Sequence, residues 1–155
     1  LSIMYSFGRL KANNPFIGGF VKESIHQGVY QFSKKNEMKV FRMHLTQQQG
    51  EMLKHEIERF EKQSELYHYN FLGLAFIPLK VKYVRKNHYF CSQFISELFI
   101  KIAILDQSIR PEWTSPRDLI KYLDLELVFE GYIRDYPLLD THKENYGYSS
   151  TLTDR

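Results

Sequence analysis

Apolar and polar positions alternate in parts of the chain, and this period of two is typical of half-buried β-strands. Residues 38–45 alternate most clearly, with three apolar side chains on one face, and residues 125–132 follow the same pattern. Two shorter stretches, 2–7 and 29–32, are apolar and aromatic. We therefore predict four strands, the first of them closed by a turn at Gly8.

Three other stretches repeat their apolar residues at intervals of three and four, as the buried face of a helix does. These stretches are 47–64, 91–104 and 115–123. Thr46 and Gln49 have the spacing of a capping box. Ser115 and Pro116 supply a cap and a proline suited to the first helical position. The aromatic segment 67–74 would form a further short helix.

Turn-forming and charged residues separate these elements. Asn13-Asn14-Pro15 and Gly18-Gly19 predict irregular backbone, and residues 20–25 would make one helical turn. Residues 34–37 would form a hairpin turn, and the basic stretch 80–86 would be an exposed loop. The expected fold class is α+β, with a small antiparallel sheet packed against the helices 47–64 and 91–104. We expect one domain over residues 1–136, followed by a weakly ordered polar tail over 137–155.

The composition narrows the classes of function. The chain has 155 residues, of which 43% are hydrophobic, enough for one sizeable core. Its net charge of +3 comes from interleaved acids and bases, a pattern that does not favour nucleic acid as a partner. A single cysteine forms neither an internal disulfide nor a zinc site with several thiolates. No apolar run approaches the ~20 residues that span a bilayer, and no signal peptide is visible. The compartment stays open at this stage, with a cytoplasmic location slightly favoured, and we expect no cofactor.

The single cysteine, Cys91, lies where an aromatic strand-like run passes into the helix 91–104. Backbone N–H groups at a helix start, together with the helix dipole, stabilise a thiolate. A lone cysteine is, however, more often a small buried hydrophobic residue than a catalyst. Cys91 is therefore a candidate nucleophile whose assignment depends on its neighbours.

Acyl transfer by a cysteine also needs an imidazole within hydrogen-bond reach. The six histidines are His26, His44, His55, His68, His88 and His142. His55 and His142 fall on a solvated helix face and in the polar tail, and His44 lies on the polar side of its strand. His68 and His88 are the two that would approach Cys91, although neither spacing fixes the geometry. The sequence of this chain thus predicts a thiol without a clear base.

The residues around Cys91 resemble a known family. The run Phe90-Cys91-Ser92-Gln93-Phe94-Ile95, preceded by Tyr69-Asn70-Phe71-Leu72-Gly73-Leu74, is similar to the motifs of the circularly permuted papain-like cysteine hydrolases. That branch includes lecithin–retinol acyltransferase-like proteins and relatives of bacterial cell-wall amidases. The resemblance extends over residues 1–136 and implies a permuted papain-like fold.

The resemblance also implies roles for individual residues. Cys91 would be the nucleophile, and the catalytic histidine would lie on a strand just upstream of Leu1. Residues 2–7 would then be the neighbouring strand, with Tyr5 or Ser6 as the group that orients the imidazole. Gln93, Tyr69 and Asn70 would line the substrate site. The implied substrate is a small molecule, peptide or lipid that offers an amide, ester or thioester bond.

Two other interpretations stay open at this stage. The chain would be a binding or structural module if it retained the fold without a base, and the fragment without its histidine would be inactive. Local alternatives also exist for three residues: Gln93 as a helix-surface amide, Tyr69 as a core residue and Asn70 as a backbone cap. The basic stretch 80–86 would bind a membrane surface, but a solvated loop is the favoured interpretation. The oligomeric state stays open.

Overall fold

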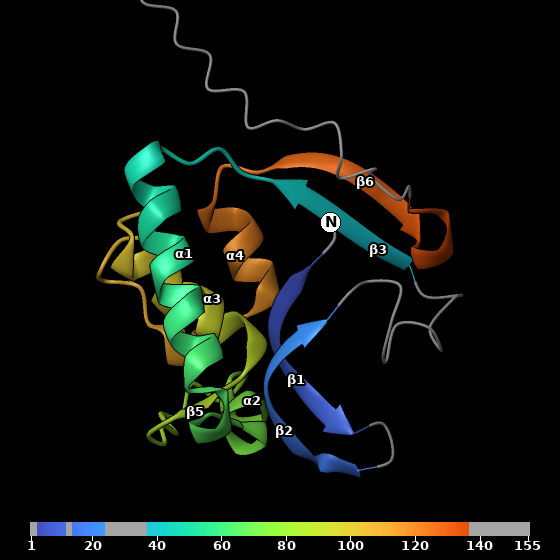
Figure 1. Ribbon diagram of the computed structural model, residues 1–155. Helices are drawn as coiled ribbons and strands as arrows, with labels where there is room; N and C mark the ends of the chain where they lie inside the picture. Colours follow the sequence, from blue (N-terminus) through green and yellow to red (C-terminus); the bar gives the residue numbers. More distant parts are fainter. Residues whose placement is uncertain (1–2, 12–13, 24–36, 137–155) are drawn as a thin grey trace, which may run out of the picture.

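The computed structural model describes residues 3–11, 14–23 and 37–136, which form an α+β fold with two sheets (Figure 1). The first sheet has four strands and the second has two. The expected strand at 29–32, the first three residues of the turn expected at 34–37 and the tail at 137–155 lie outside the described residues, and residue 37 belongs to a strand.

The four-stranded sheet has the order β1-β2-β4-β5. Its strands are β1 (Met4–Lys11), β2 (Asn14–Glu23), β4 (His68–Tyr69) and β5 (His88–Tyr89). The first two neighbouring pairs are antiparallel, whereas β4 and β5 are parallel. The sheet is therefore mixed, and the prediction of an antiparallel sheet was wrong in this respect. The chain between β4 and β5 makes a crossover through a helix, as a parallel pair requires.

Strand β2 includes the residues for which we predicted irregular backbone and a helical turn. Gly18 pairs with Arg9 and Gly19 with His68, so both glycines lie inside the sheet. A Cβ atom on Gly18 would lie 2.7 Å from the Gly8 carbonyl oxygen and 2.7 Å from Cβ of Tyr69. Gly18 thus permits close approach of neighbouring strands, and neither glycine ends an element. Gly8 likewise lies within β1, which continues to Lys11.

The second sheet pairs β3 (Glu37–Arg42) with β6 (Glu126–Tyr132) in antiparallel orientation. It lies apart from β1 and β2 in Figure 1. Both strands were predicted, although β3 ends three residues early. The register shifts between Val40 and Phe41, and both side chains are half-buried. The predicted strict alternation is therefore wrong at this point, because a bulge places consecutive residues on similar sides.

The helices predicted at 47–64, 91–104 and 115–123 are present, whereas the segment 67–74, predicted as one short helix, is a strand at 68–69 and a helix only from residue 71. The helices are α1 (Gln47–Lys62), α2 (Phe71–Phe76), α3 (Cys91–Lys101) and α4 (Pro116–Tyr122), with 3-10 turns at Ser64–Leu66, Pro111–Trp113 and Ile133–Asp135. Both predicted caps are present, Thr46 with Gln49 and Ser115 with Asp118. Helix α3 ends before residue 104 because Ala103 has a left-handed backbone, with φ of 56°. The basic stretch 80–86 forms neither helix nor strand.

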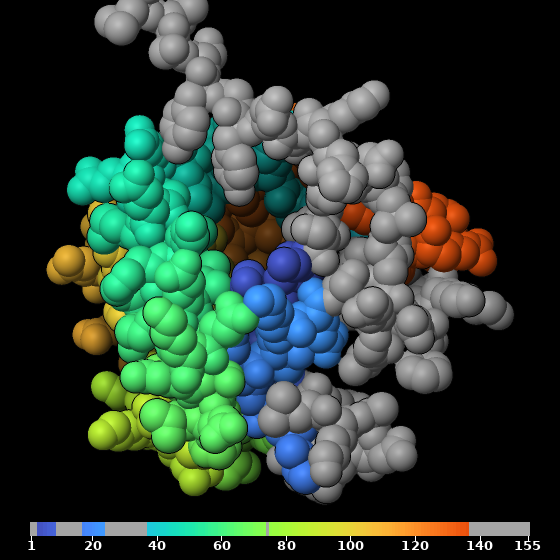
Figure 2. All heavy atoms as spheres, in the orientation of Figure 1, coloured from blue at the N-terminus to red at the C-terminus, as the bar shows by residue number. Residues whose placement is uncertain are grey.

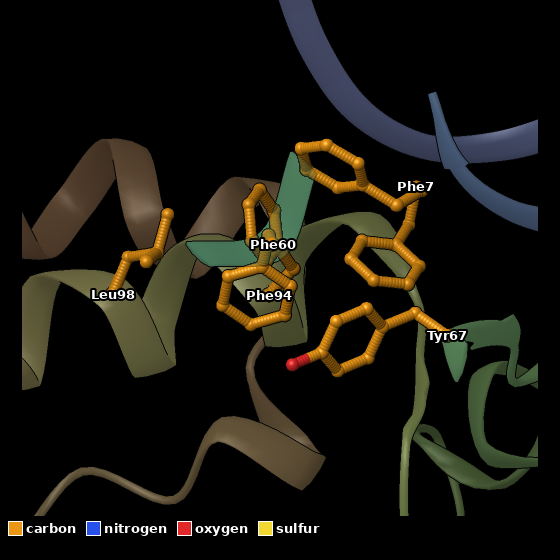
Figure 3. Close-up of a cluster of buried hydrophobic side chains, with 6 residues drawn as sticks. Phe7, Phe60, Tyr67, Phe94 and Leu98 are labelled. Atoms are coloured by element: carbon orange, nitrogen blue, oxygen red, sulfur yellow. The ribbon is translucent and has the colours of Figure 1, made fainter. Parts of the chain in front are cut away.

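An aromatic core joins the four-stranded sheet to α1 and α3, as predicted. Its buried members are Phe7, Phe20, Phe60, Tyr67, Phe94 and Leu98. Figure 3 shows Phe7, Phe60, Phe94 and Tyr67 as neighbouring rings. Leu98 lies to one side of them, further along α3. On the face shown in Figure 2, the atoms of α1 lie directly against those of β1 and β2. The first strand and the cysteine helix therefore share one core.

Candidate functional site

Cys91 is the first residue of the eleven-residue helix α3, and a single residue, Phe90, separates it from the end of β5. Its thiol is free and partly exposed. Positions 91, 94 and 98 fall on one stripe of a helix, and Phe94 and Leu98 are buried in the core. The cysteine therefore lies on the stripe that faces the sheet, and it reaches solvent because it occupies the first turn.

The backbone around Cys91 leaves donors available. Phe90, the N-cap residue, makes no side-chain capping hydrogen bond. The first hydrogen bond within the helix runs from the Phe94 N–H to the Phe90 carbonyl at 3.0 Å. The amides of residues 91–93 precede this bond and have no acceptor within the helix. These N–H groups would favour a thiolate or an oxyanion beside them.

Asn70 holds the chain segments that meet beside Cys91. Its side chain is 2% exposed. Its Nδ2 donates to the Tyr83 carbonyl at 3.2 Å, and its Oδ1 accepts from the Gly73 N–H at 3.0 Å. Its backbone N–H donates to the Tyr89 carbonyl at 2.8 Å. This arrangement favours the backbone-capping interpretation of Asn70 over contact with substrate.

Tyr69 lies in β4, paired with Tyr89 of β5. Its ring is half-buried and lies 4.5 Å, centroid to centroid, from the ring of Phe71. It belongs with the partly buried aromatic residues that pack against the core. The structure therefore brings Tyr69 close to the chain segment that enters α3, where it packs against the core.

Gln93 is buried, so it is neither an exposed amide nor open to solvent in a cleft. It is 2% exposed, and its Nε2 donates to the Glu97 carboxylate at 3.2 Å. Within the described part of the chain, its Oε1 has no hydrogen-bond partner, and neither has Oγ of the buried Ser92. Two polar atoms in the first turn of α3, within two residues of Cys91, are therefore buried without a hydrogen-bond partner among the described residues.

Tyr5 and Ser6 occupy opposite faces of β1, because side chains alternate along a strand. Tyr5 stacks on Phe20, with ring centroids 5.9 Å apart, and its hydroxyl donates to Glu61 of α1 at 3.5 Å. Ser6 is half-buried and pairs with Val21 of β2. The structure brings neither residue into a hydrogen bond with a histidine among the residues it describes.

Four histidines fall in the described part of the chain. His44 is 88% exposed beside Glu126, and His55 is exposed on α1. His68 and His88 pair across β4 and β5, with ring centroids 5.1 Å apart, and His88 Nδ1 lies 2.8 Å from the Lys86 carbonyl. Among the described residues, no imidazole makes a hydrogen bond to the Cys91 thiol. His26 and His142 lie outside the described residues.

Sequence reasoning missed a half-buried acid on α3, Glu97. Burial raises the pKa of the Glu97 carboxyl above its ordinary value, although the hydrogen bonds from Gln93 and Tyr89 oppose this change. Burial, followed by the charge of Glu97, raises the pKa of Tyr89 to about 12. The four-residue spacing of Gln93 and Glu97 was the available signal, since such pairs share one helix face.

We expect Glu97→Gln to change how stability depends on pH. The folded protein holds the Glu97 proton more tightly than the unfolded chain does, because the pKa is raised from 4.5. The stabilisation that protonated Glu97 gives the folded state is fully present below the pKa of the unfolded chain, and it is lost as pH rises through the pKa of the folded protein. The glutamine variant has no titrating group at position 97. Its melting temperature should therefore rise relative to that of the wild type as pH rises from about 4 to 8. Thermal melts across this range measure the difference, and parallel curves would contradict it.

The comparisons with known proteins do not identify the chain: no family model matches it, and neither does any curated protein or solved structure. Within the described ranges, no group of three or more histidine, cysteine or acidic side chains is arranged to hold a metal ion. No helix of that part has the length and apolar character needed to cross a membrane.

Proposed function

We propose that Cys91 is the nucleophile of a hydrolase or acyltransferase of the permuted papain-like type. One observation carries the proposal: a partly exposed thiol stands at the uncapped start of α3, where three backbone amides precede the first helical hydrogen bond. Such a position combines a nucleophile with donors for the oxyanion. The substrate class is an amide, ester or thioester.

The reaction would proceed in two steps. The Cys91 thiolate attacks the carbonyl carbon, the bond to the leaving group breaks, and the leaving amine, alcohol or thiol takes a proton from the protonated imidazole base. The imidazole then takes a proton from water or an acyl acceptor as this attacks the thioester, the carbon–sulfur bond breaks, and the acyl product and the thiolate are released. Amides at the start of α3 would bind the oxyanion that forms in both steps.

Neighbouring elements support this assignment. Strand β1 packs against α3 through Phe7 and Phe94, whose ring centroids lie 5.0 Å apart. Asn70 fixes the backbone on both sides of the segment that leads to Cys91. The base would be an imidazole from outside the described residues, on a strand beside β1. Tyr5 or Ser6 would be the group that orients it.

Chemical labelling of the intact chain tests the nucleophile. Iodoacetamide should alkylate Cys91 at pH 6.5 at least about tenfold faster in the folded protein than in the urea-unfolded chain, because the helix start stabilises the thiolate. p-Nitrophenyl acetate should release one equivalent of p-nitrophenol in a burst, leaving acetylated Cys91 detectable by mass spectrometry.

The matched variants are Cys91→Ala and Ser92→Ala. Cys91→Ala should abolish the burst. Ser92→Ala changes the next residue, whose buried Oγ has no hydrogen-bond partner among the described residues, and it should leave the burst intact. Labelling that becomes fast only in urea would refute the nucleophile.

The second candidate is a non-catalytic binding or structural module. It is favoured by the absence, within the described part of the chain, of an imidazole bonded to the thiol, and by the burial of Asn70 and Gln93. This candidate predicts a folded chain whose Cys91 reacts no faster than an unfolded thiol. The same labelling experiment therefore distinguishes the two functions.

A further inference from the structure

The segment that links α2 to β5 exposes both aliphatic and cationic side chains. Leu79, Val81 and Val84 are 68%, 49% and 53% exposed. Lys80, Lys82, Arg85 and Lys86 are all exposed between and beside them. Single exposed aliphatic residues are common on protein surfaces, whereas three within six residues are a local cluster. We call residues 79–86 the basic–aliphatic segment; in Figure 1 it belongs to the yellow-green chain near β5.

The segment is held in place, so its exposed side chains are part of an ordered surface. The Tyr83 ring packs against Phe76, with centroids 5.6 Å apart, and the Tyr83 carbonyl accepts the hydrogen bond from Asn70. At its start, the Lys80 N–H donates to the Ile77 carbonyl, and at its end the His88 N–H donates to the Arg85 carbonyl, both at 3.1 Å. Tyr83 anchors the segment while its aliphatic neighbours stay in solvent.

The cations of the segment are largely available to a partner. Lys82 lies 3.8 Å from Glu112 and keeps 64% of its side chain exposed. The charge of Lys80 contributes a minor part to the lowered pKa of Asp118, at the start of α4. No ion pair engages Arg85 or Lys86 within the described residues. The segment therefore carries a local positive charge that two nearby acids offset in part.

We propose that the basic–aliphatic segment binds the surface of an anionic lipid bilayer. Cations at such a surface meet the lipid headgroups, and neighbouring aliphatic side chains enter the boundary of the acyl chains. The segment supplies both groups in alternation. A purely electrostatic partner, such as nucleic acid or an acidic protein, would use the cations and leave Leu79, Val81 and Val84 in solvent. The exposed aliphatic side chains are what favour the bilayer over a purely electrostatic partner.

Vesicle binding by the intact chain tests this proposal. Vesicles of phosphatidylcholine with 30% phosphatidylserine should retain the protein in low salt, and pure phosphatidylcholine vesicles should not. The triple variant K80Q/R85Q/K86Q should bind on the order of a hundredfold more weakly, at about fivefold for each cation removed. The control K39Q/K54Q/K62Q removes the same charge from exposed positions on β3 and α1, and it should stay within about twofold of the wild type.

A second variant separates insertion from simple charge attraction. L79S/V81S/V84S retains every cation and the Tyr83 anchor, and it should bind the same vesicles at least about tenfold more weakly. Unchanged binding by this variant would overturn the bilayer proposal in favour of a general polyanion site. Equal loss in both charge variants, or no retention of the wild type, would also overturn it. Circular dichroism and melting temperatures matching those of the wild type confirm that the variants are folded.

Discussion

Replacement of Phe60 by alanine is expected to lower the free energy of unfolding by about 4 kcal/mol, as measured by urea denaturation. Phe60 is 3% exposed, and its ring contacts the rings of five other residues. These are Phe7, Phe20, Tyr67, Tyr89 and Phe94, with centroids between 4.5 and 6.2 Å away. Removing the ring loses its burial and leaves a cavity between α1, α3 and the sheet. Since domains are stable by only about 5–15 kcal/mol, this one change would remove a large share.

Two further variants define the origin of this effect. Phe60→Leu keeps most of the apolar volume and should cost about 1 kcal/mol. Tyr122→Ala removes a ring that is 52% exposed on α4 and should change stability by less than about 0.5 kcal/mol. A loss at Phe60→Ala no greater than that at Tyr122→Ala would show that the aromatic cluster is not the core of the fold.

Gly73→Ala is expected to destabilise the protein by about 2 kcal/mol, although alanine is the better helix former. Gly73 lies in α2, and a Cβ atom there would collide with Nδ2 of Asn70 and lie 2.7 Å from its Cγ. Asn70 would have to move and lose one of the hydrogen bonds that it makes to Tyr83 and Gly73. A buried polar group left without its partner costs about 1–3 kcal/mol, more than the helical preference for alanine gains.

Gly50→Ala provides the matched control for this change. Gly50 also lies in a helix, α1, but among the described residues no side chain and no backbone outside its own part of the helix lies within 4 Å of the position that its Cβ would take, its two chain neighbours apart. This substitution should stabilise the protein by about 0.5–1 kcal/mol. Opposite signs for the two glycines, measured by urea denaturation, are the expected result. Stabilisation by both would show that Asn70 does not pack against Gly73 as described.

The sequence predicts the helices well because their signals are local. The capping boxes at Thr46 and Ser115 and the apolar stripe of α3 depend on residues within one or two turns. Strand β2 was missed because its glycines are explained by distant residues: Gly18 makes room for Tyr69, some fifty positions along the chain. Periodicity contains no information about such an approach.

The candidate site was likewise predictable from the sequence only in its local features. The start of a helix at Cys91 was predictable from the pattern that follows it. The burial of Asn70 and Gln93 was not, because it depends on which side of α2 and α3 meets the rest of the fold. Glu97 looks like an ordinary helix-surface acid in the sequence, and only tertiary packing places it beside Tyr89 and raises its pKa.

The pairing of β3 with β6 has a consequence for the order of assembly. The 83 residues from 43 to 125 lie between the two strands, so their first contact closes a long loop. The entropy lost on closing a flexible loop rises with its length, whereas the β1–β2 hairpin and α1 form from neighbouring residues. We infer that the hairpin and α1 form first, and that the aromatic core, which joins them to α3, then holds the two ends of that loop together. The β3–β6 ribbon would then be the last part of the described chain to form, and the first to open while α3 and Cys91 remain in place.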